Sequence, residues 1–137
     1  MILLDTCALI WDALAPDRLT PNARLAIDGA IDGAIHDAGR ELMICDISIW
    51  EIAILMKKGR LVVDETPSGF INLLIEARNL HIQGITPEIA ELSVNLGPEI
   101  NNDPADRLIA TTSILMSAPI VTADRNLRQS AMLETIW

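Results

Sequence analysis

Acidic side chains in this sequence recur where a short apolar run gives way to a helix-like pattern. Asp5 directly follows such a run, and Asp124 follows another in the segment PIVTAD. Glu51 lies in SIWE, a few residues after a third run, and Asp106 lies in DPAD at the start of an apolar helical pattern. Carboxylates held close together repel one another unless a cation offsets their charge, and Mg²⁺ and Mn²⁺ prefer such hard oxygen ligands. If the four side chains converge, they predict a metal site for phosphate chemistry, where the metal acidifies a water molecule and a carboxylate accepts its proton.

Each acid taken alone also has a structural explanation. Asp5, Asp103 and Asp124 can each cap the first turn of a helix, and Ser48 with Glu51 fits an S-x-x-E capping box. Asp106 stands where the helix dipole favours a negative charge. The set as a whole points to a ligand site, because helices that follow parallel strands begin at the sheet edge where ligands bind.

The elements that would position these acids form a strand–helix alternation. Five short apolar runs predict strands, namely ILL, ELMIC, HIQGI, PIVT and TIW, at residues 2–4, 41–45, 81–85, 119–122 and 135–137. Such runs are typical of strands covered by helices on both faces. Three helix starts combine a capping Thr with a Pro at the first helical position, at Thr20, Thr66 and Thr86. Residues 26–35 predict an amphipathic helix. The alternation therefore predicts an α/β fold with a parallel sheet and helices on both sides.

Length, charge and composition narrow the class of protein. The 137 residues fit a single domain spanning 1–137, with an aliphatic core because aromatic residues are few. The net charge of −9 argues against a surface that coats nucleic acid generally, but it permits a site where bound cations reverse the local sign. A mean hydropathy of +0.34 predicts apolar surface that a homodimer or another partner covers.

The sequence also predicts a cytoplasmic protein without a membrane segment. The N-terminus lacks a signal-peptide pattern, and the longest apolar stretch contains Glu51 and is too short to cross a bilayer. Cys7 and Cys45 are far apart in the sequence, which predicts two reduced, buried thiols. Trp11 and Trp50 lie in apolar patterns and are expected in the core or in a dimer contact, with base stacking as the alternative.

Four blocks in order, MILLDTCALIW, ISIWEIAILMKKGRL, DPADRLIATTSI and PIVTADRNL, make the chain resemble the PIN-domain ribonucleases, specifically the VapC-type toxins. The resemblance implies a three-layer α/β/α sandwich around a central parallel sheet. It also implies a Mg²⁺- or Mn²⁺-dependent endoribonuclease that hydrolyses RNA phosphodiester bonds with a metal-activated water. Such an enzyme would be the toxin of a type II toxin–antitoxin system, with a cognate antitoxin as partner. Carried over residue by residue, the acidic metal-site positions are Asp5, Glu51, Asp106 and Asp124.

The resemblance adds three supporting residues and one departure. Asp103 matches an additional acid in the DPxDR subgroup, and Thr6 and Thr122 match hydroxyl neighbours of the site. Asn101 stands where many members with this block have a histidine, so a role of that histidine in binding substrate or partner is not transferred.

Basic residues near these blocks are candidates for RNA contact. The densest positive patch consists of Lys57, Lys58 and Arg60. Complementation of a helix C-terminus is the alternative explanation for that patch. Arg125 and Arg128 flank Asp124 and either seat RNA or face solvent. Arg107 either binds a phosphate or pairs with Asp103.

Two further functions compete with the ribonuclease. A receiver-like signalling domain also binds Mg²⁺ with acids at strand ends, but HIQGIT supplies no acid and PIVTAD no lysine where such a domain needs them. A catalytically inactive PIN-fold binding module would be expected to lack one of the acids, whereas this chain has all four.

Overall fold

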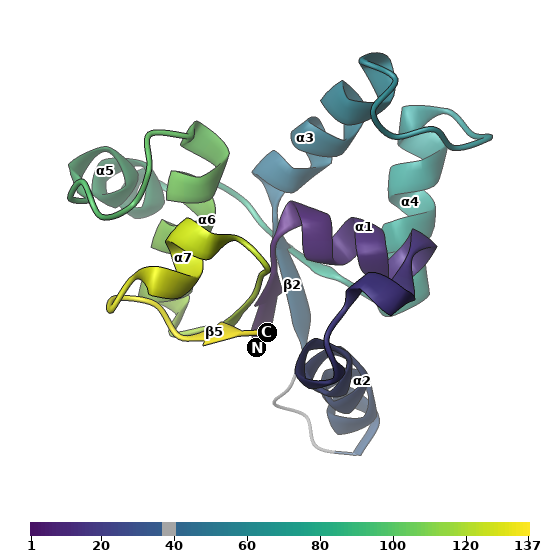
Figure 1. Ribbon diagram of the computed structural model, residues 1–137, viewed down its shortest axis with the longest axis horizontal. Coiled ribbons are helices and arrows are strands. Elements are labelled where there is room, and N and C mark those ends of the chain that lie inside the picture. Colours follow the sequence, from purple (N-terminus) through teal and green to yellow (C-terminus); the bar gives the residue numbers. More distant parts are fainter. Residues whose placement is uncertain (37–40) are drawn as a thin grey trace.

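The computed structural model describes residues 1–36 and 41–137, and it describes side chains outside residues 30–40. Its five strands are β1 (Ile2–Leu4), β2 (Leu42–Cys45), β3 (His81–Gln83), β4 (Ile120–Val121) and β5 (Thr135–Ile136). They form one parallel sheet in the order β3-β2-β1-β4-β5 (Figure 1). The predicted parallel α/β sheet is confirmed, and each strand lies within its predicted run. This order differs from the 2-1-3-4-5 order of receiver-like folds.

Helices connect the strands and cover both faces of the sheet. They are α1 (Thr6–Leu14), the 3₁₀ turn η1 (Pro16–Arg18), α2 (Pro21–His36), α3 (Asp46–Lys57), α4 (Pro67–Arg78), α5 (Pro87–Asn95), α6 (Pro104–Met116) and α7 (Arg125–Gln129). The helix predicted over 26–35 lies within α2, but the side chains of its second half are outside the described residues. In the described part of the chain, no helix is long and apolar enough to cross a membrane.

The alternation of side chains along the strands separates two apolar layers. Leu4, Leu42 and Ile44 face a cluster that includes buried residues of α1, α2, α3 and α4. Leu3 and Met43 point to the opposite face and pack with α6. Figure 1 shows the same division, with α5, α6 and α7 on one side of the sheet and α1 to α4 on the other. The result is a three-layer α/β/α sandwich.

Helix starts follow the predicted Thr-Pro and Asp-Pro signals. The side-chain oxygens of Thr20, Thr66 and Thr86 accept the backbone N–H groups three residues ahead, at 3.1 to 3.2 Å. The capping box suggested for Ser48 and Glu51 is wrong, because α3 already begins at Asp46, directly after β2. Ser48 and Glu51 therefore lie inside α3, where their side chains are available for contacts with other elements.

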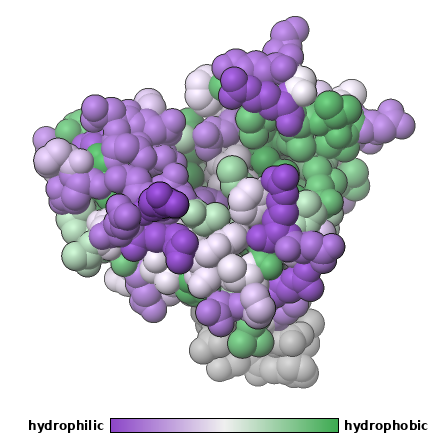
Figure 2. Space-filling model, viewed as in Figure 1, coloured by the Kyte–Doolittle hydropathy of each residue, from purple (hydrophilic) through white to green (hydrophobic). Residues whose placement is uncertain are grey.

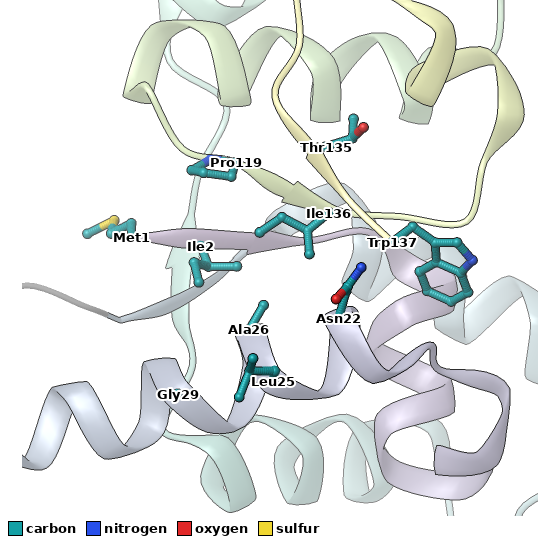
Figure 3. A pocket seen from close by; sticks show the side chains of 10 residues that line it. All are labelled: Met1, Ile2, Asn22, Leu25, Ala26, Gly29, Pro119, Thr135, Ile136 and Trp137. Atoms are coloured by element: carbon teal, nitrogen blue, oxygen red, sulfur yellow. The ribbon is translucent and has the colours of Figure 1, made fainter.

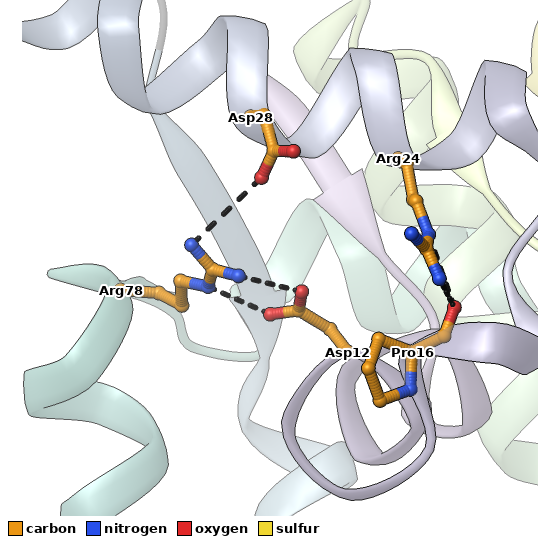
Figure 4. A network of polar contacts seen from close by, with 5 residues as sticks. All are labelled: Asp12, Pro16, Arg24, Asp28 and Arg78. Atoms are coloured by element: carbon orange, nitrogen blue, oxygen red, sulfur yellow. Dashed lines mark hydrogen bonds and ion pairs between the residues drawn. The ribbon is translucent and has the colours of Figure 1, made fainter.

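A partly buried ion pair joins α1 to α4. The Arg78 guanidinium donates two hydrogen bonds to the Asp12 carboxylate, at 2.8 and 2.7 Å (Figure 4). The Asp12 side chain is only 7% exposed, and Asp28 of α2 lies 4.0 Å from the same guanidinium. Arg78 thus ties α4 to α1, the helix that begins at Asp5.

The expectation of two buried thiols is wrong for Cys7, which is exposed, whereas Cys45 is buried as predicted. Trp50 is 61% exposed on α3 and does not belong to the core, so of its expected places the dimer contact and base stacking stay predictions. Trp11 does pack against the core, and its ring lies 5.8 Å from that of Trp137.

Candidate functional site

The candidate site lies at the carboxyl edge of the sheet. It is at the point where the sheet, after growing from β1 to β2 and β3 on one side, continues with β4 and β5 on the other side of β1. β1 has β2 on one side and β4 on the other, so the crevice between β1 and β4 is the topological switch point. Asp5 follows β1, and Asp124 comes three residues after β4 ends. Glu51 and Asp106 reach the same region from the first two turns of α3 and α6.

All four acids line one hollow of about 270 Å³, which we call the acidic hollow. Its full lining consists of Asp5, Thr6, Cys7, Trp11, Glu51, Asp106, Ile109, Ala123 and Asp124. This lining contains no Lys, Arg or His. The hollow therefore gathers negative charge from four separate segments, and no basic side chain is among its lining residues.

Asp5 is the deepest of the four acids and is held on both carboxylate oxygens. One oxygen accepts the Ala8 N–H at 2.7 Å, which caps α1, and the other accepts the Thr122 hydroxyl proton. The Thr122 oxygen also accepts the Asp124 N–H at 3.0 Å. Thr122 thus links the two acids that follow neighbouring strands, as expected for a hydroxyl next to the site.

Glu51 is held from the other side of the hollow. The Thr6 hydroxyl donates to its carboxylate, and the Thr6 and Ser48 hydroxyl oxygens are 2.9 Å apart. Because a hydroxyl has one proton, Thr6 can donate to Glu51 only while Ser48 donates to Thr6. Ser48 is completely buried, so this chain of hydroxyls fixes Glu51 relative to α1.

Asp106 and Asp103 have different surroundings although both start α6. The Asp103 carboxylate accepts the Asp106 N–H at 3.0 Å and is a helix cap that does not line the acidic hollow. Asp106 accepts a hydrogen bond from the Asn101 side-chain amide at 2.9 Å. Asn101 is positioned in turn by Asn126, whose side-chain oxygen accepts from the Asn101 backbone N–H at 3.0 Å.

The environment raises the pKa of three of these carboxylic acids. Burial raises the pKa of Asp5 from 3.8 to about 6, against the lowering effect of hydrogen bonds from Thr122 and Ala8, and the charges of Asp106 and Asp124 raise it further. Burial is also the largest cause of the raised pKa values of Glu51 and Asp106. Both values are raised further by neighbouring carboxylates, so the hollow lacks compensating positive charge.

The donor set fits a hard divalent cation, although the side chains are not at coordinating positions. Within the described residues, no three His, Cys, Asp or Glu side chains already form a group that could hold a metal ion. Mutual repulsion and the hydrogen bonds to Thr122, Thr6 and Asn101 explain the spread of the carboxylates around the hollow.

The predicted pairing of Arg107 with Asp103 is wrong, because backbone carbonyl groups occupy the Arg107 guanidinium. Its guanidinium donates to the backbone carbonyl oxygens of Ser93, Leu96, Ile100 and Asn101, at 2.6 to 3.3 Å. These bonds satisfy carbonyl groups at the end of α5 and in the following loop. Arg107 therefore fixes the segment that delivers Asn101 to the site.

The other basic candidates lie outside the acidic hollow. Three of them are exposed at the end of α3 and in the turn after it, namely Lys57, Lys58 and Arg60. Arg125 and Arg128 are exposed on α7 and line a separate hollow of about 360 Å³ with Gln129, Thr135 and Trp137.

The residues that sequence reasoning missed are supporting ones. Ser48 lies 42 residues from the Thr6 that it contacts, and Asn126 lies 25 residues from Asn101. Only the fold brings these pairs together, so no local pattern reveals them. Cys7 also lines the acidic hollow, and its position directly after Asp5 and Thr6 at a helix start could have indicated this.

A larger hollow of about 600 Å³ lies elsewhere and lacks this chemistry. It is lined by residues such as Met1, Ile2, Leu25 and Ile136, between α2 and the sheet (Figure 3). Its lining contains no acidic or basic side chain. Size alone would have selected the wrong site.

Comparison with known proteins identifies the family. The family model described as the PIN domain matches residues 2–132. Ribonuclease VapC22 of Mycobacterium tuberculosis is 34% identical over 127 residues, which is 93% of this chain and 89% of that protein.

Two solved structures share the fold. The VapBC2 complex of Rickettsia felis bound to a promoter DNA fragment has a TM-score of 0.68 at 17% identity, covering 98% of this chain and 97% of the other. A toxin–antitoxin complex from Klebsiella pneumoniae has a TM-score of 0.61 at 20% identity, covering 97% and 95%. With the family match across nearly its whole length, this chain belongs to the PIN-domain family.

Proposed function

We propose that this protein is a divalent-metal-dependent endoribonuclease and the toxin of a type II toxin–antitoxin pair. The observation that carries the proposal is the meeting of four carboxylates at the switch point of the sheet, in a hollow whose lining has no basic residue. The 34% identity to a protein named as a ribonuclease supports the same activity.

Mg²⁺ or Mn²⁺ fits this oxygen-rich donor set, and Asp5, Asp106 and Asp124 are the residues that would hold it, with Glu51. When bound, the cation supplies positive charge that stabilises the phosphodiester and makes a water molecule more acidic. Asp5 itself is already fixed by Thr122 and the Ala8 N–H.

Glu51 is the side chain best placed to accept a proton from the attacking water. Its pKa is raised by burial, which brings it toward the range where a carboxylate works as a general base. The Thr6 hydroxyl holds one carboxylate oxygen of Glu51 and leaves the other free to take the proton. Asp103 acts as a helix cap and takes no part in the chemistry.

RNA contact is proposed for exposed basic residues outside the hollow, namely Lys57, Lys58 and Arg60 at the end of α3 and in the turn after it, and Arg125 on α7. Large apolar side chains such as Val62, Val94 and Leu25 are more than 70% exposed, which supports a homodimer and a cognate antitoxin as partners. The solved structures with the same fold include toxin–antitoxin complexes. Action on cellular RNA places the protein in the cytoplasm as part of this proposal.

RNA cleavage by the purified protein with Mg²⁺ or Mn²⁺ tests the proposed activity. We expect Asp106→Asn to lower the cleavage rate at least a hundredfold, because it removes a metal-site charge. Asp103→Asn is the matched control three residues away, since asparagine is also a good helix cap and should leave the rate near that of the wild type. Equal rates for all three proteins would refute the assignment, and so would wild-type cleavage that persists in EDTA.

A further inference from the structure

The hollow beside α7 contains groups that suit a nucleotide. Its lining consists of Arg125, Arg128, Gln129, Thr135 and Trp137, and we call it the Arg–Trp hollow. Two guanidinium groups match phosphate oxygens, and the Gln129 amide can donate and accept hydrogen bonds at a base edge. The Trp137 indole packs partly against the core and also lines the larger hollow, and its part in this lining is of a type that stacks on bases. Its volume of about 360 Å³ is larger than that of the acidic hollow.

The Arg–Trp hollow adjoins the acidic hollow along two walls. Arg125 directly follows Asp124, so the first wall is the start of α7. The second wall is a tryptophan pair, because Trp11 lines the acidic hollow, Trp137 lines the Arg–Trp hollow, and their ring centroids are 5.8 Å apart. Trp137 follows β5 directly, so the same sheet edge that carries Asp5 and Asp124 also delivers this indole.

The arginines of this hollow are not used by the fold. Within the described residues, neither Arg125 nor Arg128 forms an ion pair, whereas Arg24 pairs with Asp17 and Arg78 with Asp12. Figure 2 shows strongly hydrophilic side chains gathered over α7. In a chain with a net charge of −9, two adjacent arginines without acidic partners form a local positive surface beside a negative site.

We propose that the Arg–Trp hollow is a nucleotide subsite that binds the residue of a single-stranded RNA next to the scissile phosphate. Trp137 stacks on the base, Arg125 and Arg128 hold the phosphate, and Gln129 contacts the base edge. The stacked base must be unpaired, so the subsite selects single-stranded RNA at the cleavage point. This inference rests on the proposed ribonuclease function, and it adds the substrate class and the residues that select it.

Binding of a short fluorescein-labelled single-stranded RNA of mixed sequence tests the subsite by anisotropy. We would use the Asp106→Asn background, which blocks cleavage. Trp137→Leu should weaken binding roughly tenfold, and Trp137→Phe should keep most of the affinity because phenylalanine still stacks. Trp50→Leu is the matched control, since Trp50 is exposed on α3 away from both hollows. Duplex RNA should respond to neither tryptophan change, because its bases are already stacked.

The salt dependence gives a second readout that altered folding would not reproduce. Each phosphate contact to a single strand adds about 0.7 to the slope of log affinity against log salt. Arg128→Gln should lower the slope by about that amount, whereas Arg24→Gln should leave it unchanged. In the Asp106→Asn background, identical salt slopes with and without Arg128→Gln would overturn the proposal. Equal affinities of the Trp137→Leu and Trp50→Leu proteins would overturn it as well.

Photo-crosslinking with RNA that contains 4-thiouridine locates the contact directly. Trypsin separates the three tryptophans into fragments 1–18, 41–57 and 129–137. The subsite predicts crosslinks to 129–137, while crosslinks confined to 41–57 would assign the base to the α3 side instead. If the wild-type protein cleaves RNA but these tests fail, only the proposed subsite is refuted. If the wild-type protein cleaves no RNA, the proposed function itself is refuted.

Discussion

Asp5 combines burial, two hydrogen bonds and neighbouring negative charge, and the burial and the charge destabilise its ionised carboxylate. The side chain is 8% exposed, and its pKa is raised from 3.8 to about 6. The folded protein therefore binds this proton more tightly than the unfolded chain does. As a result, the free energy of unfolding falls as pH rises from 3.8 to about 6, and the loss is complete above that range.

Asp5→Asn should stabilise the metal-free protein at pH 7, because it removes a buried charge and keeps an oxygen that can accept the Ala8 N–H. A shift of about 2 pKa units corresponds to about 3 kcal/mol at most, and the weakened contact with Thr122 reduces the gain to about 2 kcal/mol. Urea unfolding in EDTA between pH 4 and pH 7.5 measures it. The variant should also lose most of the decline in stability between pH 4 and pH 6. A variant less stable than the wild type at pH 7 would contradict the raised pKa.

At the scale of single residues, the sequence predicted the side chains that would do the chemistry but not the residues that hold them in place. Asp5, Glu51, Asp106 and Asp124 are recognisable from their positions after strands or at helix starts. Ser48 and Asn126 contribute through contacts with Thr6 and Asn101, which lie 42 and 25 residues away, and no local pattern encodes such contacts. Arg107 is the instructive failure, because its position in the DPAD block suggested the site and its hydrogen bonds go to the backbone behind it.

At the scale of elements, the ion pair between α1 and α4 holds the helix that carries Asp5. Asp12 is buried and its carboxylate is bound in a bidentate way by Arg78. Breaking such a pair leaves a buried charge without its partner, which is more destabilising than losing the attraction alone.

Arg78→Gln should lower the free energy of unfolding by about 2–3 kcal/mol, because Asp12 would lose two charge-assisted hydrogen bonds. Chemical denaturation at neutral pH gives the value. Arg24→Gln serves as the control, since Arg24 pairs with the fully exposed Asp17, and its effect should be much smaller. Equal effects of the two substitutions would mean that the Asp12–Arg78 pair does not tie the helices together.

Most elements were predictable because their signals are local. The apolar runs and the Thr-Pro starts depend on neighbours in the sequence, and the structure follows them closely. The capping box at Ser48 failed for a specific reason. β2 passes directly into α3 at Asp46, so the box residues fall within the helix and not at its start.

At the scale of the whole molecule, the strand order determines the site. The order β3-β2-β1-β4-β5 makes β1 and β4 neighbours, although the first residue of β4, Ile120, comes 116 positions after the last residue of β1, Leu4. This neighbour relation brings Asp5 and Asp124 into one crevice, and it depends on strand pairing that the sequence pattern does not specify. The family resemblance implied that the acids share one site, but it did not give this strand order.

The fold also explains why an acidic chain can be suited to act on RNA. Four negative side chains are concentrated in the acidic hollow, and exposed basic residues lie outside it on α7 and at the end of α3. Under the proposed function, the hollow would bind the cation and these basic groups would contact RNA, while the overall charge of −9 disfavours indiscriminate binding of nucleic acid.

Calorimetric titration of the purified protein with Mn²⁺ at pH 7.5 tests the central claim most directly. If the four carboxylates form one cation site, the wild type and Asp103→Asn should bind Mn²⁺ with similar affinity, and Asp106→Asn should bind at least tenfold more weakly. Wild-type protein that binds no Mn²⁺, or an Asp106→Asn variant that binds it as tightly as the wild type, would contradict the account.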